Sequence, residues 1–536
     1  MNNRTKKTKY FLPFILILML ILQTVCNKTP SKETNSQPKK STASASSKES
    51  KKKTFNTLAL KDIPINTSVK SIKNYLYEAE DSTLSGNVKS NKILKGYTGT
   101  GYVEGFQADN TDTCTFEIEI DESGAYDLNF RSASSDGGSK INFVALDGMN
   151  IGSISVEGKT FTDSKLNHIY IKKGKHTISV SKSWGYICLD SLSITSSKSL
   201  DKDTFHIASD LINPNATTRA KMLMKFLSDT YGKYVISGQY ATLGLNSPEF
   251  QLIKEISGKV PAILGLDLIE YSPSRVAHGS TSYAINKAIN FDKEGGIVTF
   301  CWHWNPPKEY LYNTDKIPWW KGFYKEGSSI DLEKIMNGED KNGKDLLLKD
   351  IDAIAFQLKR LQSENIPILF RPLHEASGGW FWWGASGSEP YKQLWQLLYD
   401  RLTNYHKLNN LIWVWNGQDG DWYPGDNYVD IIAEDIYPGK NVTSTQSGKF
   451  NDALHYTKSH KLIALSENGF LPDPDSMFLD DARWSYFSTW SDEFILNTAR
   501  DTSQQYISKE ALKKVYNHDK VLTLDELPDL KNYPIN

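Results

Sequence analysis

Two glutamates at the ends of strand-like apolar runs could supply the acid and the nucleophile of a hydrolysis. Glu375 ends the segment RPLHE (371–375), and Glu467 lies in the segment LSENG (465–469). A pair of carboxylates that face each other can cleave a glycosidic bond, one acting as acid and the other as nucleophile. A single glutamate at a strand end is more often a salt-bridged surface residue, so the hypothesis depends on the pair.

Aromatic and polar residues cluster at neighbouring run ends, in the segments WHWNPP (302–307), GGWFWWG (378–384) and EDIY (434–437). The chain has 14 Trp, and all but Trp184 lie between Trp302 and Trp490. Aromatic faces pack against the C–H faces of sugar rings, while polar neighbours satisfy the hydroxyls. The composition of these ends therefore favours a sugar site.

The elements that would position these residues are strand-like runs that alternate with amphipathic stretches such as 347–363 and 391–406. Eight runs occur after residue 204, at 234–238, 262–268, 297–304, 366–375, 411–417, 429–437, 462–468 and 486–490. Eight alternations over about 300 residues predict a (β/α)8 TIM barrel at 204–536, with function at the carboxyl ends of the strands. A doubly wound open sheet is the rival, but no Gly-rich phosphate loop follows the first run.

A different pattern precedes the barrel. Short alternating segments at 113–120, 125–131 and 176–180 are separated by Asp-Gly turns, which predicts a β-sandwich over 71–195. The polar residues 196–203 are typical of a linker.

The first residues are typical of an export signal. Basic residues precede the apolar run 11–22, which is shorter than the roughly 20 residues of a membrane span. We therefore expect a signal peptide at 1–26 and a secreted protein; an uncleaved anchor is the alternative. Cys26 after the run resembles a bacterial lipoprotein site, and the sequence leaves its lipidation open. Residues 27–70 are rich in Ser, Lys and Thr, which predicts a disordered tether.

Composition excludes several classes of protein. The net charge is −1, which gives no basic surplus for nucleic acid. Four Cys without a CxxC pair exclude a disulfide scaffold and give no sign of a zinc site.

Together the segments RPLHE, GGWFWWG, WHWNPP and LSENG resemble glycoside hydrolase family 26 over residues 204–530. That family consists mostly of endo-β-1,4-mannanases built on a barrel with catalytic glutamates on strands four and seven. The resemblance implies that Glu375 is the acid/base and Glu467 the nucleophile of a retaining mechanism, with Arg371 or Tyr437 holding Glu467 charged. The other substrate-binding positions that it implies are His303, His374, Trp380, Tyr437, Asp435 and, as sugar platforms, Trp302 and Trp490.

Two of these histidines have other interpretations. His374 could ligate a metal, although no second His follows at helical spacing. His303 could be a buried structural residue, although its WHW context favours a site.

The sandwich resembles a carbohydrate-binding module of family 35 or family 6, a β-jelly roll, through YEAE (77–80), GTGYV (99–103) and WGYICLD (184–190). The resemblance implies a structural Ca²⁺ bound by Glu78, Glu80 and Asp190, and oxygen ligands suit that ion. The alternative is that Glu78 and Glu80 form a solvated strand edge. Trp184 and Tyr102 are the expected sugar contacts. The sequence does not say whether Cys114 and Cys188 pair.

The resemblance implies an endo-β-1,4-mannanase without a catalytic cofactor, acting on plant cell-wall mannan, galactomannan or glucomannan. The same mechanism on mixed-linkage glucan or β-1,3-xylan is an alternative, as is a surface glycan-binding protein without catalysis. We expect no nucleic-acid partner, and membrane contact only through a lipid on Cys26.

Overall fold

The structure is a computed structural model that describes residues 60–66, 69, 72–108, 111–497 and 503–535. The predicted signal peptide at 1–26, with Cys26, and most of the predicted tether at 27–70 lie outside the described residues. Within the described ranges, no helix is both long and apolar enough to cross a membrane.

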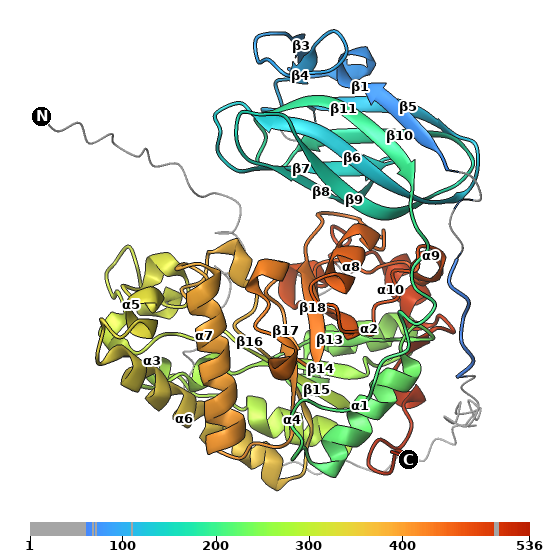
Figure 1. Ribbon diagram of the computed structural model, residues 1–536. Helices are drawn as coiled ribbons and strands as arrows, with labels where there is room; N and C mark the ends of the chain where they lie inside the picture. The colour runs from blue at the N-terminus through green and yellow to red at the C-terminus, as the bar shows by residue number, and fades with distance from the viewer. Residues whose placement is uncertain (1–59, 67–68, 70–71, 109–110, 498–502, 536) are drawn as a thin grey trace, which may run out of the picture. The chain divides into compact units, whose positions relative to one another are not determined.

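The N-terminal module is a sandwich of two antiparallel sheets (Figure 1). One sheet has the order β3-β4-β11-β6-β9 with β1 beside β11: β1 (Asn74–Glu78), β3 (Lys89–Asn91), β4 (Tyr102–Glu104), β6 (Gly124–Ser134), β9 (Thr162–Ile171) and β11 (Ile187–Ser196). The other has the order β2-β5-β10-β7-β8: β2 (Thr83–Ser85), β5 (Thr113–Ile120), β7 (Lys140–Leu146), β8 (Met149–Val156) and β10 (Gly174–Lys182). This confirms the predicted β-sandwich.

Alternation along the strands explains why the sheets pack face to face. In β5, Phe116, Ile118 and Ile120 are buried, while Glu117 and Glu119 between them are exposed. Side chains of a strand point alternately to its two faces, so this pattern buries one face of the sheet in the core.

The C-terminal region contains a closed barrel of eight strands, β13 to β20, paired in parallel in chain order. Its strands are β13 (Gly238–Tyr240), β14 (Ile263–Asp267), β15 (Ile297–Trp302), β16 (Ile368–Pro372), β17 (Leu411–Trp415), β18 (Ile431–Ile436), β19 (Leu462–Asn468) and β20 (Phe487–Thr489). This confirms the predicted TIM barrel and excludes the open doubly wound sheet. The strands are buried along nearly their whole length, as expected for a parallel sheet covered by helices.

The first barrel strand differs from the prediction. Residues 235–236 of the run 234–238 form β12 (Val235–Ile236), which pairs outside the barrel with β21 (Val521–Leu522). The barrel strand begins at Gly238 and closes the barrel through a single register pair, Gln239 with Thr489.

Helices surround the strands (Figure 1): α1 (Thr218–Thr230), α2 (Pro248–Ser257), α3 (Pro273–Val276), α4 (Ala284–Lys293), α5 (Leu332–Met336), α6 (Gly343–Ser363), α7 (Ser388–Tyr399), α8 (Ser447–Leu454), α9 (Pro474–Leu479) and α10 (Lys509–Tyr516). The predicted stretch 347–363 lies in α6, which buries Leu347, Ile351, Ile354 and Leu358 along one face at helical spacing. The stretch 391–406 becomes α7 followed by a π-helical turn at Asp400–Tyr405.

Candidate active site

The two predicted catalytic glutamates lie together at the carboxyl ends of the barrel strands. Glu467 belongs to β19, and Glu375 follows β16 by three residues. One carboxylate oxygen each of Glu375, Glu467 and Asp435 lies within 4.8 Å of the others. Three carboxyl groups so close in a buried place repel one another when all are ionised, so the surroundings must divide their roles.

Two donors hold the side chain of Glu467. Nη2 of Arg371 lies 2.5 Å from its Oε2, and the hydroxyl of Tyr437 donates to its Oε1. Glu467 is only 6% exposed. A cation and a hydroxyl that donate to its two oxygens fix the orientation of this side chain in the site.

Arg371 is fully buried and joins several groups beneath the site. Its Nη1 donates to Oδ2 of Asp435 at 2.5 Å, and its Nη2 also lies 3.1 Å from the hydroxyl of Tyr240. Gly265 on β14 makes room for that ring, because a Cβ there would lie 2.6 Å from the ring atoms of Tyr240. The site therefore rests on a packed layer of charged and aromatic side chains.

The backbone turns sharply to present Glu375. Its φ is +54°, in the left-handed region, and Leu373 two residues earlier has φ +51°. The amide of Glu375 donates to the backbone carbonyl and to the side-chain oxygen of Asn416, at 2.7 and 3.0 Å. Strained backbone held in this way is common at active sites.

Electrostatics suit Glu375 to carry a proton. Burial, followed by the charge of Glu467, raises the pKa of Glu375 from 4.5 to about 7, although Arg371 and the Trp380 hydrogen bond oppose this. Nε1 of Trp380 donates to Oε2 of Glu375 at 3.0 Å. Two carboxyl groups whose surroundings divide them into an acid and a carboxylate are the pattern of a glycosidase pair.

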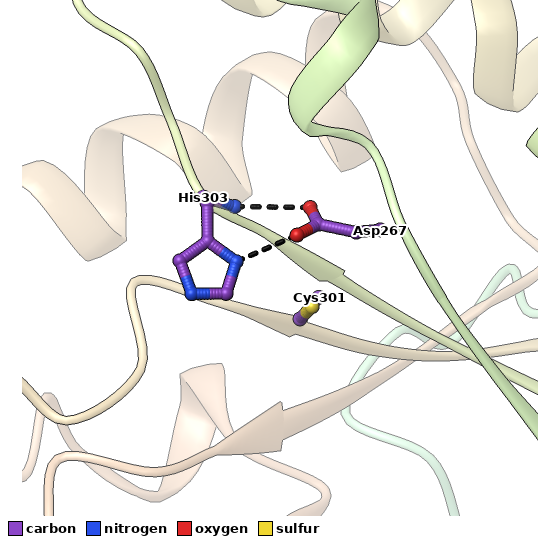
Figure 2. A group of neighbouring side chains, drawn as sticks. All are labelled: Asp267, Cys301 and His303. Atoms are coloured by element: carbon purple, nitrogen blue, oxygen red, sulfur yellow. Dashed lines mark hydrogen bonds and ion pairs between the residues drawn. The ribbon is translucent and has the colours of Figure 1, made fainter. Parts of the chain in front are cut away.

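His303 and His374 face each other. Their Nε2 atoms lie 3.1 Å apart, and Nδ1 of His303 lies 2.6 Å from Oδ2 of Asp267, as Figure 2 shows for the second contact. His374 belongs to no group of three His, Cys, Asp or Glu within ligand reach among the residues that the structure describes. Cys301, also drawn in Figure 2, is buried, and burial raises the pKa of its thiol well above its ordinary value.

The expected substrate-binding aromatic residues separate into two groups. Trp380, Tyr437 and Trp490 are partly exposed, and the ring centroid of Trp490 lies 4.7 Å from that of Tyr240. Trp302 is fully buried, with its ring stacked 4.2 Å from that of Trp304 and its Nε1 on Ser272. Because Trp302 has no free face, the prediction of a sugar platform there is wrong.

Asp435 also lies too deep to touch a sugar. Its side chain is 0% exposed and accepts hydrogen bonds from Arg371 and from Ser466, the latter at 2.7 Å. The prediction that Asp435 binds substrate directly is therefore wrong; it supports Arg371 from below.

In the module, one of the two expected sugar contacts is accessible. Trp184 is 50% exposed, whereas Tyr102 is 2% exposed and packs its ring against Phe161. The prediction that Tyr102 grips a sugar is wrong, because its hydroxyl bonds to the Leu94 amide inside the sheet layer. Cys114 and Cys188 are both buried and free, so they do not pair.

The three acidic residues expected to bind Ca²⁺ lie around one loop. Glu78 accepts from the Thr98 hydroxyl, Asp190 from the Thr98 amide, and Oε1 of Glu80 from the Thr100 amide. Oε2 of Glu80 is buried and has no partner among the described residues. Asp190 also pairs with Arg131 at 2.9 Å.

Sequence reasoning missed several residues that position this site. Asp267, Tyr240 and Asn416 each lie at or next to the end of a barrel strand, a signal that singles out candidates without giving their roles. Tyr324 lies in the long loop after β15, where no periodic pattern marks it. Burial, with Glu375 adding to it, raises the pKa of Tyr324 to about 12, so its hydroxyl stays protonated near the acid/base.

Comparison with known families agrees with this geometry. The model of glycosyl hydrolase family 26 matches residues 212–526, which is more than half of the chain. The chain belongs to glycosyl hydrolase family 26. The model of carbohydrate binding module family 35 matches residues 75–197. This family 26 chain is therefore a glycoside hydrolase joined to a carbohydrate-binding module.

The chain matches known proteins over most of their length. The chain is 42% identical to a mannan endo-1,4-beta-mannosidase of Thermothelomyces thermophilus, over 84% of this chain and 90% of the relative. It is 36% identical to mannan endo-1,4-beta-mannosidase B of Piromyces sp, over 85% of this chain and 78% of the relative. The solved structure of the Podospora anserina GH26-CBM35 beta-(1,4)-mannanase matches with TM-score 0.59 and 39% identity, over 86% of this chain and 99% of that chain.

Proposed function

We propose that this chain is a secreted endo-β-1,4-mannanase that hydrolyses mannan, galactomannan or glucomannan with retention of configuration. The names of its relatives support the activity, and the pair Glu375 and Glu467 supports the chemistry. Export rests on the basic and apolar start of the sequence.

The short separation of the two carboxyl groups is the observation that carries the retaining mechanism. Oxygens of Glu375 and Glu467 lie within 4.8 Å of each other. Retaining enzymes hold their carboxyl groups about 5–5.5 Å apart, whereas inverting enzymes need about 6.5–9.5 Å to seat a water.

The proposed reaction has two steps. Glu467 attacks the anomeric carbon while Glu375 gives its proton to the leaving oxygen, which produces a covalent glycosyl–Glu467 intermediate. Glu375, now a carboxylate, takes a proton from water, and that water displaces Glu467. Tyr437 and Arg371 donate to Glu467 before it attacks, and they donate to it again when the second step releases it.

Azide rescue of two alanine variants tests the roles. Glu375→Ala should accumulate the intermediate from an aryl β-mannobioside with a good leaving group, and azide should then give the β-azide. Glu467→Ala should give the α-azide, because azide occupies the space of the lost nucleophile. The opposite products would mean that the roles are exchanged, and α-configured sugar as the first product of the wild type would mean inversion.

Digestion of a panel of polysaccharides tests the substrate. Mannan, galactomannan and glucomannan should be cleaved internally, with an early fall in viscosity. Faster cleavage of mixed-linkage glucan or β-1,3-xylan would overturn the proposed substrate without affecting the mechanism.

We also propose that the module holds a structural Ca²⁺ through Glu78, Glu80 and Asp190 and contacts sugar through Trp184. The buried oxygen of Glu80 without a partner fits a cation, and so does Glu78, because burial and then the nearby acidic groups raise the pKa of its carboxyl. Against this, Arg131 already neutralises part of Asp190. Oxygen ligands of this kind suit Ca²⁺, which would fix the loop and take no part in the hydrolysis.

A further inference from the structure

The two histidines beside the catalytic pair form a chain of contacts that begins at Asp267. Asp267 ends β14, His303 follows β15 and His374 follows β16, so neighbouring strands bring the three residues together. Oδ1 of Asp267 accepts from the amides of Ile269 and His303, at 2.9 and 3.1 Å. Its Oδ2 lies 2.6 Å from Nδ1 of His303, as drawn in Figure 2.

These contacts restrict the hydrogens on the two histidine rings to two arrangements. A carboxylate only accepts hydrogen bonds, so Nδ1 of His303 must carry a hydrogen. The two Nε2 atoms, 3.1 Å apart, need one hydrogen between them. Either His303 is an imidazolium that donates to neutral His374, or neutral His374 donates to neutral His303.

The charges around the pair decide between these arrangements. Burial lowers the pKa of His303, but the Asp267 carboxylate outweighs it and the net shift is upward. Burial, then Arg371 and His303, lowers the pKa of His374 well below its ordinary value. Burial raises the pKa of Asp267, but His303 outweighs it and the net shift is downward. Both partners of the Asp267–His303 pair are therefore stabilised in their charged forms.

We propose that Asp267 is a positioning residue that keeps His303 as an imidazolium, with its Nε2–H directed at His374 beside the acid/base Glu375. This rests on the proposed function of Glu375 and Glu467. The charged or titratable groups that face His303 are Asp267 from β14, Cys301 from β15, Arg371 from β16, His374 and Glu375 after β16, and Glu467 from β19.

The imidazolium has a consequence for Glu375. His303 lies near enough that its charge lowers the pKa of Glu375 and so opposes the effects of burial and Glu467. Three uncharged aromatic rings also pack near His303, with ring centroids at 5.3, 5.6 and 6.0 Å for Phe323, Phe381 and Trp490. His303 is buried, so its charge is screened less than that of an exposed histidine.

The substitution Asp267→Asn removes the charge of this side chain and keeps its shape. The amide oxygen should keep the two backbone hydrogen bonds, which turns the NH₂ toward Nδ1 of His303. Nδ1 must then accept, so the remaining ring hydrogen moves to Nε2 and His303 becomes neutral while its contact with His374 survives. The matched control is Asp350→Asn, the same change at a buried aspartate of α6 that accepts from Nε1 of Trp304.

The first measurement does not depend on activity. In the full chain labelled with ¹⁵N at its 10 His, the ring with a strongly downfield Nδ1–H should carry hydrogens on both nitrogens at pH 6.5. His374 should carry its hydrogen on Nδ1. Both hydrogens of His303 should be visible in Asp350→Asn, and Asp267→Asn should lose the downfield signal. A neutral His303 in the wild type would overturn the proposal, whether or not the variants fold.

The second measurement is the pH profile of kcat/KM on a mannooligosaccharide. Asp267→Asn should lower kcat/KM by about 10- to 100-fold, as expected for loss of a hydrogen bond to a charged group. Its alkaline limb should move to higher pH, since Glu375 loses a neighbouring positive charge; in Asp350→Asn the limb should stay in place. A uniform fall without movement of the limb would overturn the proposed effect on Glu375. If Glu375→Ala stays fully active, the proposed function fails, while the spectra still decide the state of His303.

Discussion

The hydrogen bond from Trp380 to Glu375 should help to set the pH above which Glu375 loses its proton and can no longer act as the acid. Nε1 of Trp380 donates to Oε2 of Glu375 at 3.0 Å, and this contact lowers the pKa of the carboxyl. Trp380→Phe keeps an aromatic ring at the position and removes only the donor. The carboxylate form of Glu375 then loses a partner, so its pKa should rise.

The size of the rise follows from the energy of the lost bond. A hydrogen bond to a charged group contributes about 1.5–3 kcal/mol, and one pKa unit corresponds to about 1.4 kcal/mol. Because Glu375 is partly exposed, we take the lower end, which is about one unit. The alkaline limb of kcat/KM should therefore move from near pH 7, the value to which its surroundings raise the pKa of Glu375, to near pH 8.

The ratio of kcat/KM at pH 8 to that at pH 6 measures the change on mannohexaose. This ratio should be about 0.1 for the wild type and about 0.5 for Trp380→Phe, from the fractions of protonated acid at each pH. Trp382→Phe is the control, because its Nε1 donates to the Trp304 carbonyl instead. With a dinitrophenyl mannobioside, whose leaving group needs no protonation, the pH profile of kcat/KM should have no alkaline limb in either variant. A limb that stays in place or moves to lower pH in Trp380→Phe would refute the reasoning.

Three further results are expected. Arg371→Gln should lower the free energy of unfolding by about 3–5 kcal/mol in urea, because it leaves Glu467 and Asp435 buried without their cation; an unchanged urea midpoint would contradict this. Trp184→Ala should weaken retention on insoluble mannan and leave hydrolysis of soluble mannohexaose unchanged, and equal loss on both would mean that Trp184 is structural. Chelation of Ca²⁺ should lower the melting temperature of the module, since a hundredfold excess of ligand contributes about 2.7 kcal/mol, and should leave mannohexaose hydrolysis intact; a loss of hydrolysis with unchanged melting would refute the assignment.

The sequence predicted the fold best where an apolar run corresponds to a buried strand. Each barrel strand overlaps a predicted apolar run, because a parallel strand covered by helices must be apolar along its length. The prediction for the first run was wrong in part. Its apolar residues Val235 and Ile236 form β12 and pair with β21, whereas the barrel strand β13 begins at Gly238, where that run ends.

Within the site, the sequence predicted which strand ends meet but not the depth of each side chain. Trp302 ends β15 and His303 follows it, yet the ring of Trp302 stacks on that of Trp304 while Nε2 of His303 lies beside that of His374 in the site. Asp435 lies in β18 and Tyr437 directly follows that strand, but the first is fully buried against Arg371 and the second donates to Glu467. Depth of this kind depends on pairing register and on partners from other strands, such as Asp267, which no local pattern contains.

The seam that closes the barrel has a consequence for how the chain is made. Gln239 on β13 contacts Trp490 beyond β20, 251 residues later, and Ser237 beside β12 bonds to Leu522, 285 residues later. At roughly 5–20 residues per second, a ribosome needs on the order of 10–60 seconds to supply these partners, and β13 waits with one side unpaired. An open strand edge invites pairing with other nascent chains, and short edge strands reduce that hazard. At three residues, β13 gives neighbouring chains little to pair with during this wait.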